Sequence, residues 1–332
     1  MKDPRTDGRR LGERLRARDL TAAPAALNLV ESRADTARSE TEALLATVSP
    51  AALGGEAPAR IVGVTGPPGV GKSTLLSGLL AAWRRRGESV ALLAVDPSSR
   101  RSGGSLLGDR ARIDRDPSDA SVFIRSTAAG DRLGGLAPAT RAAVAALSAA
   151  FDVVVIETVG VGQSETEVAE VADTVAVVIQ PGSGDVLQFL KAGIMEVPDV
   201  LVVNKADLGA VADRAMADLR AALRSLGARK ASVIAVSSVP PPRGIDALVE
   251  ALDQHHASLA LPARRADARR MHALADFAAE HGDAGMRALG GRRAAERWLA
   301  EQDGLRDAAT LRRELERRAG RAARAPGGPG EP

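Results

Sequence analysis

A glycine-rich segment that ends in lysine and serine carries the strongest chemical signal in the sequence. Residues 66–74 read GPPGVGKST and fit the pattern G-x-x-x-x-G-K-[ST], between an apolar run at 61–64 and a helical stretch at 75–86. Glycines let backbone N–H groups curl around phosphate oxygens, and a helix N-terminus adds positive potential. We therefore expect Lys72 to act on the terminal phosphates and Ser73 to ligate Mg²⁺. The expected nucleotide contacts of this loop are Gly66, Pro67, Gly69, Val70, Gly71, Lys72, Ser73 and Thr74.

A second motif, NKAD at residues 204–207, favours guanine over adenine. Asp207 can accept hydrogen bonds from both the ring N–H and the exocyclic amine of guanine, whereas adenine offers no such adjacent pair of donors. Lys205 can lie along the sugar and the base. The motif follows an apolar run, and open parallel sheets bind ligands at the carboxyl ends of their strands. The sequence thus predicts that the chain binds GTP and GDP.

A third motif, ETVG at 157–160, also follows an apolar run. P-loop hydrolases at this position hold Mg²⁺ through an acid and sense the terminal phosphate through a glycine N–H, here Glu157 and Gly160. Many GTPases have aspartate where Glu157 stands. Gln163 could orient the attacking water. The alternative is a polar loop that only caps a strand.

Two further carboxylates suit Mg²⁺ coordination, directly or through water. Asp96 ends an apolar run, and Asp109 lies in the glycine-rich segment 103–110. The glycines indicate a loop that moves with the nucleotide state, with a static turn as the alternative. Glu157 and Asp109 are the expected catalytic carboxylates beside Lys72 and Gln163.

These motifs need a sheet to position them, and six short, mostly β-branched runs predict one. The runs alternate with helical stretches, which is typical of an α/β, doubly wound, mostly parallel sheet. They cover residues 61–64, 90–95, 153–156, 175–179, 200–203 and 233–236. We expect four regions: an N-terminal helical extension at 1–55, a P-loop GTPase domain at 56–255, a C-terminal helical arm at 256–324 and a disordered tail at 325–332. The expected buried face of one or two helices in the arm is Trp298, Leu299, Leu305, Leu311 and Leu315.

Composition excludes several classes of function. The chain of 332 residues has no cysteine, which removes disulfides and thiolate chemistry. Aromatic residues make up only 2%, with no tyrosine, which argues against a nucleic-acid partner. No apolar stretch is long enough to span a membrane, so we expect a cytoplasmic protein. The adjacent His255 and His256 are interpreted as a solvated helix end rather than a metal site.

The motifs together resemble one family. GPPGVGKST, DPSS with GGSLLGDR, RSTAAGDRLGGL, ETVGVGQSE, PGSGDVLQFLKAGIMEVPD and NKAD, in this order and spacing, look like the MeaB/ArgK group of GTPases associated with methylmalonyl-CoA mutase. The resemblance covers about residues 25–255. It implies a homodimeric GTPase that gates delivery of adenosylcobalamin to an acyl-CoA mutase and protects that mutase.

The resemblance also implies roles for particular residues. Asn204 and Asp207 would read guanine, and Ser237-Ser238 would stand in the last base-binding loop, where the family usually has Ser-Ala. The segment 185–199 resembles an additional mobile loop, with Gln188 and Lys191 as its working residues.

Two other functions stay open from the residues alone. A metallochaperone GTPase that inserts nickel is one, although such proteins need soft or imidazole ligands, and this chain has four histidines and no cysteine. A P-loop phosphotransferase is the other, although no region dedicated to an acceptor is evident.

Overall fold

A computed structural model describes residues 6–32, 34–96, 113–128, 138–158, 168–182, 198–225 and 231–324. The chain divides into two compact units. One contains Ala17–Pro24 and Pro58–Leu259 and holds the sheet; the other contains Met1–Arg16, Ala25–Ala57 and Ala260–Pro332 and is helical. Both terminal helical regions thus belong to one unit. No helix among the described residues is long and apolar enough to cross a membrane.

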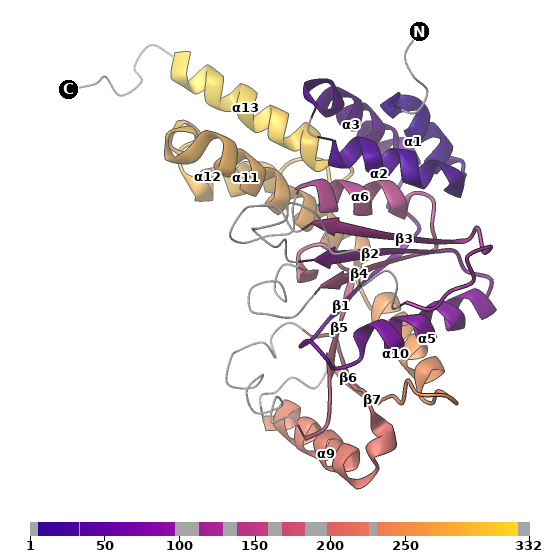
Figure 1. The fold of residues 1–332 in the computed structure, drawn as a ribbon. Helices are drawn as coiled ribbons and strands as arrows, with labels where there is room; N and C mark the ends of the chain where they lie inside the picture. The colour runs from indigo at the N-terminus through magenta and orange to yellow at the C-terminus, as the bar shows by residue number, and fades with distance from the viewer. Residues whose placement is uncertain are drawn as a thin grey trace, which may run out of the picture. The chain divides into compact units, whose positions relative to one another are not determined.

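The sheet unit is built on seven strands in the order β3-β2-β4-β1-β5-β6-β7, and every neighbouring pair is parallel (Figure 1). The strands are β1 (Arg60–Thr65), β2 (Val90–Asp96), β3 (Val122–Ala128), β4 (Val153–Thr158), β5 (Thr174–Ile179), β6 (Val200–Val203) and β7 (Ser232–Ala235). The six predicted strands are confirmed within one or two residues at their ends. The edge strand β3 was not predicted.

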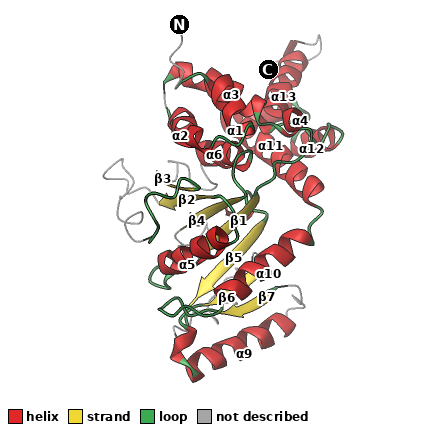
Figure 2. Cartoon of the chain, turned by 90° about the vertical axis from the view of Figure 1, so that its right-hand side faces the viewer, coloured by secondary structure: helices red, strands yellow, loops and turns green. Residues whose placement is uncertain are grey.

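The sheet unit also contains helices. They are the 3₁₀ helix η1 (Leu20–Ala22), α5 (Lys72–Arg85), α6 (Pro138–Ser148), the 3₁₀ helix η4 (Ala206–Leu208), α9 (Ala210–Ser225) and α10 (Ile245–Ala257). Helices α5 and α10 pack on one face, where their leucines share a core with alternate strand residues such as Val153 and Val155 (Figure 2). The residues between these, such as Val154 and Ile156, do not belong to that core but are also fully buried. Side chains alternate between the two faces of a strand, so the opposite face of the sheet is covered as well.

The helical unit has a core of its own. Its elements are α1 (Gly8–Arg16), α3 (Asp35–Thr47), α4 (Pro50–Leu53), α11 (Leu261–Ala288), α12 (Arg292–Ala300) and α13 (Ala308–Arg324), and α2 (Ala23–Glu31) begins just before it. Leu299, Leu311 and Leu315 are buried there as predicted, and Trp298 is partly buried. Leu305 is a correction: it lies in the turn between α12 and α13 and is 37% exposed. The other four residues of the predicted face lie on two helices, α12 and α13.

Arg269 in α11 bonds to two other segments of the helical unit, the one before the sheet and the turn between α12 and α13. Its guanidinium makes bidentate bonds to the Glu56 carboxylate, at 2.7 and 2.9 Å, and also donates to the carbonyl of Gly304. A paired fork of this kind is among the stronger polar contacts in proteins, because two parallel bonds are charge-assisted.

An ion pair fixes the far end of the P-loop helix. Arg84 in α5 donates to Asp119 at 2.7 Å and to the carbonyl of Glu88 at 2.6 Å. The hydrogen bond from Arg84, with a second from the Ser121 N–H, lowers the pKa of Asp119 below its ordinary value. This carboxylate therefore contributes stability above its unfolded pKa, and that contribution is lost as the pH falls through the lowered folded pKa.

We expect Asp119→Asn to lower the free energy of unfolding at neutral pH by less than about 1 kcal/mol, the usual limit for a partly exposed pair, and so to lower the urea midpoint slightly. The difference from the parent should shrink towards zero in strongly acidic buffer, where both proteins lack the charge. Urea unfolding followed by circular dichroism at both pH values checks this. A difference that stays constant with pH would contradict it.

Candidate nucleotide site

The loop between β1 and α5 has the curled geometry that a phosphate cradle needs. Gly66 has φ of 145°, and a Cβ there would lie 2.1 Å from the carbonyl oxygen of Val178, so only glycine fits. Lys72 is buried, and its ammonium donates to the carbonyls of Gly66 at 2.7 Å and Pro67 at 3.1 Å. The ammonium thus lies against the inner carbonyls of the loop.

Asn204 fastens the end of β6 to this loop. Its amide Nδ2 donates to the carbonyl of Val70 at 2.8 Å, and the side chain is 2% exposed. A Cβ on Gly71, whose φ is 92°, would lie 2.6 Å from that same nitrogen. Gly71 therefore leaves the space that brings the two motifs into contact.

The end of β7 contributes two serines to the same cluster. Ser237 Oγ donates to Asp207 at 3.0 Å, and Ser238 Oγ donates to Asn204 Oδ1 at 2.8 Å. Since Asn204 Oδ1 accepts from Ser238, its Nδ2 is turned toward Val70. The Asp207 side chain remains exposed, as a base-reading carboxylate must be.

Lys205 contacts the glycine-rich loop and also Gln180, a partner that the sequence did not predict. Its backbone is left-handed, with φ of 57°, and leads into η4, which carries Asp207. Its ammonium donates to the carbonyl of Gly69 at 3.2 Å and to Oε1 of Gln180. Gln180 directly follows β5, and its position at a strand's carboxyl end was the only available signal.

The predicted metal ligands are partly described. Ser73 lies in the first turn of α5 and is half-buried. Glu157 in β4 is 5% exposed, and alternation from Val153 and Val155 places it on the sheet face that α5 covers. Asp96 is the last residue of β2, and its side chain is outside the described part.

Five predicted residues lie outside the described residues. They are Asp109, Gly160, Gln163, Gln188 and Lys191. The strands that precede them, β2, β4 and β5, all end at the sheet edge that carries the glycine-rich loop.

The two adjacent histidines are structural. They do end a helix as predicted, but they are not solvated: His255 is 3.1 Å from Asp199 and 2.9 Å from the Thr174 hydroxyl, and His256 is 3.7 Å from Asp173. Both side chains join α10 to the amino-terminal ends of strands.

We expect Ser238→Ala to weaken guanine-nucleotide binding about fivefold, because one buried hydrogen bond of about 1 kcal/mol is lost and Asn204 becomes free to turn. Calorimetric titration with GDP measures this. Ser232→Ala, an exposed position at the other end of β7, is the matched control and should bind like the parent. Equal affinity for all three proteins would show that Ser238 does not hold Asn204.

Known proteins resemble this chain in sequence and in fold. The family described as methylmalonyl Co-A mutase-associated GTPase MeaB matches residues 23–281. A protein of Pyrococcus abyssi that is named as a GTPase is 42% identical over 266 residues, 78% of this chain and 79% of that protein. The mitochondrial methylmalonic aciduria type A homolog of Caenorhabditis briggsae is 38% identical, over 66% of this chain and 56% of its own length. The crystal structure of an LAO/AO transport system kinase aligns with a TM-score of 0.62 and 26% identity, over 92% of this chain and 95% of that one. The chain therefore belongs to the MeaB family, with the fold of a P-loop GTPase.

Proposed function

We propose that this chain is a Mg²⁺-dependent GTPase that serves an adenosylcobalamin-dependent acyl-CoA mutase of the methylmalonyl-CoA mutase type. It gates delivery of the cofactor and protects the mutase. The observation that carries the proposal is the family match over residues 23–281, because that family is described by its association with this mutase. The relative named for methylmalonic aciduria supports the same partner.

Nucleotide binding starts from the contacts already present in the loop. Lys72 exchanges the carbonyls of Gly66 and Pro67 for phosphate oxygens, to which a buried ammonium binds more strongly. Asp207 keeps the Ser237 bond on one carboxylate oxygen and accepts from the guanine ring with the rest of its lone pairs. Asn204 and Lys205 both donate to carbonyls of the glycine-rich loop, which keeps the motif that contains Asp207 beside that loop.

The residues present fit Mg²⁺. Ser73 offers a hydroxyl in the first turn of α5, and Glu157 offers a buried carboxylate on the face of the sheet that α5 covers, both hard oxygen donors. When bound, the ion neutralises charge that develops between the outer phosphates. We propose Asp96 and Asp109 as further ligands, and Gln163 and the Gly160 N–H for the attacking water and the terminal phosphate.

The segments 96–110, 157–165 and 185–199 are proposed to carry the nucleotide state to the mutase, with Gln188 and Lys191 in the last of them. The first two segments begin at the carboxyl ends of β2 and β4, at the sheet edge that carries the glycine-rich loop, and the third follows β5 along the chain. A state change there is a local electrostatic event that a partner can read.

The test uses the purified chain and methylmalonyl-CoA mutase. We expect the mutase to change the rate of GTP turnover, and GTP to control transfer of adenosylcobalamin to the apo mutase. Lys72→Ala is the control that should abolish both effects. The proposed role would be overturned if the mutase did not change the rate of GTP turnover and GTP did not change the transfer of adenosylcobalamin.

We also propose a homodimer that forms through the C-terminal helices, on the strength of the family resemblance. Light scattering after size-exclusion chromatography should give twice the chain mass of 34.3 kDa. A mass of one chain at micromolar concentration would contradict the dimer.

A further inference from the structure

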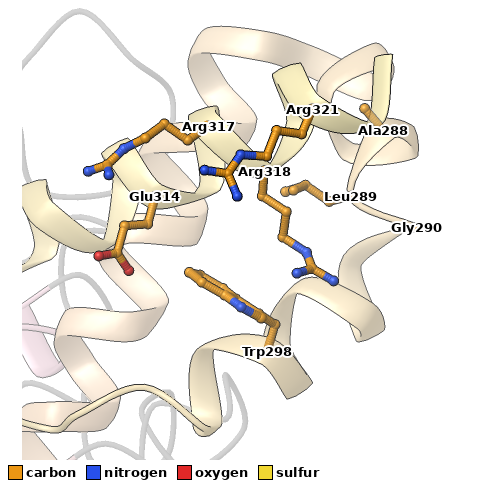
Figure 3. A pocket seen from close by; sticks show the side chains of 8 residues that line it. All are labelled: Ala288, Leu289, Gly290, Trp298, Glu314, Arg317, Arg318 and Arg321. Carbon is orange, nitrogen blue, oxygen red and sulfur yellow. The ribbon is translucent and has the colours of Figure 1, made fainter. Parts of the chain in front are cut away.

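A basic pocket of about 620 Å³ lies in the helical unit, formed by the C-terminal helices (Figure 3). Its size falls in the range of small-molecule sites. The indole of Trp298 comes from α12 and faces the side chains of α13. The polar side chains that line the pocket are Glu314, Arg317, Arg318 and Arg321.

The charges of Arg317, Arg318 and Arg321 have no paired acidic side chain among the described residues. None of them forms a hydrogen bond or an ion pair with any residue in the described ranges, and Arg318 only places its guanidinium 5.7 Å from the centre of the Trp298 ring. Glu314 could neutralise Arg318 four residues later on the same helix, which is the favourable order for such a pair. Its carboxylate instead pairs with Arg306, and Figure 3 shows Glu314 and Arg318 on opposite sides of the indole.

Some arginines of this unit do have acidic partners. Arg312 on the same helix pairs with Glu280 and Glu316, and Arg269 pairs with Glu56. A solvated helix face would explain free arginines equally well if they were scattered. Arg317, Arg318 and Arg321 gather at one cavity, and the like charges of Arg317 and Arg321, four residues apart on one helix, repel each other.

We propose that this pocket binds a phosphorylated small molecule with a planar group. Guanidinium forks match phosphate oxygens bidentately, and an anion between Arg317 and Arg321 would turn their repulsion into attraction. The exposed part of the Trp298 indole offers a flat surface on which a planar ring can stack. The site shares no residue with the glycine-rich loop, since every lining residue lies on α11, α12, α13 or the turn between α11 and α12.

The chain provides its own probe for this pocket. It has two tryptophans, and Trp83 is 1% exposed in the sheet unit. In Trp83→Phe, the only indole is Trp298. We use this variant saturated with GDP and Mg²⁺, so that the glycine-rich loop is occupied, and titrate it with ADP, tripolyphosphate or adenosine at constant ionic strength.

We expect a saturable change of Trp298 fluorescence with ADP, a weaker one with tripolyphosphate and none with adenosine. Replacing Arg317, Arg318 and Arg321 together with glutamine should weaken ADP binding at least tenfold. The matched control replaces three exposed arginines outside the pocket, Arg9, Arg293 and Arg297, with glutamine, which gives the same net charge and should leave binding unchanged.

Equilibrium dialysis of labelled ADP against the GDP-saturated parent chain gives the same comparison if Trp83→Phe is unstable. Three results would each overturn the proposal: equal loss of binding in the pocket variant and the control variant, a signal that potassium chloride reproduces, or a response to polyglutamate alone. The last result would indicate a protein-docking surface instead.

Discussion

Replacing Asp207 with asparagine should reduce GTP affinity about a hundredfold or more and create binding of XTP. Two charge-assisted hydrogen bonds to guanine are lost, each worth about 1.5–3 kcal/mol. Xanthine carries a carbonyl where guanine has its exocyclic amine, so an asparagine NH₂ can donate to it. Asn retains an oxygen that can accept from Ser237, so the loop should keep its shape. Competition against a fluorescent guanine nucleotide measures both affinities.

The control for this exchange is Asp213→Asn. Asp213 is an exposed carboxylate in the first turn of α9, which follows the motif in the sequence. The variant therefore makes the same change of charge near the motif without touching it. It should keep the parent preference for GTP. If Asp207→Asn also keeps that preference, Asp207 does not read the base.

Lys72→Ala should lower the rate of GTP hydrolysis about a hundredfold to a thousandfold, the usual effect of removing one donor that stabilises charge in the transition state. Lys72 is 7% exposed and its ammonium lies against the carbonyls of the loop, so the positive charge that it supplies is poorly screened. Phosphate release at saturating GTP measures the rate. Lys72→Arg should be nearly as inactive, because the guanidinium is larger and planar and does not fit a space that suits a compact ammonium.

Thermal unfolding of both Lys72 variants separates loss of catalysis from loss of the fold. The parent ammonium bonds two carbonyls of the same loop, so we expect only a small change in melting temperature. Hydrolysis by a folded Lys72→Ala protein within threefold of the parent rate would contradict the assigned role.

Most of the sheet could be predicted from the sequence because most of its strands are buried on both faces. Runs such as Val153 to Ile156 are fully buried, so they read as continuous β-branched segments. The strand β3 was not predicted because it is an edge strand in which Arg125, Ser126 and Thr127 interrupt the apolar pattern. A strand with one neighbour needs less continuous apolar sequence, which leaves a weaker signal.

The two nucleotide motifs were predictable for a different reason: each combines fixed residue types at fixed spacing. Gln180 has no such spacing, and its contact with Lys205 exists only because β5 and β6 are neighbours in the sheet. Likewise, nothing in the sequence places Ser238 against Asn204, since that bond depends on β7 pairing with β6. Leu305 was misplaced because its helical spacing continued through a turn.

The most direct test of the account is calorimetric titration of the purified chain with GDP and with ADP in the presence of Mg²⁺. Wild-type chain is compared with the variant that replaces Arg317, Arg318 and Arg321 with glutamine, so that the glycine-rich loop is measured alone. We predict that this variant binds GDP at one site with at least a hundredfold preference over ADP. Comparable affinities for the two nucleotides, or no binding of GDP, would contradict a guanine-nucleotide site built from the loop at 66–74 and the motif at 204–207.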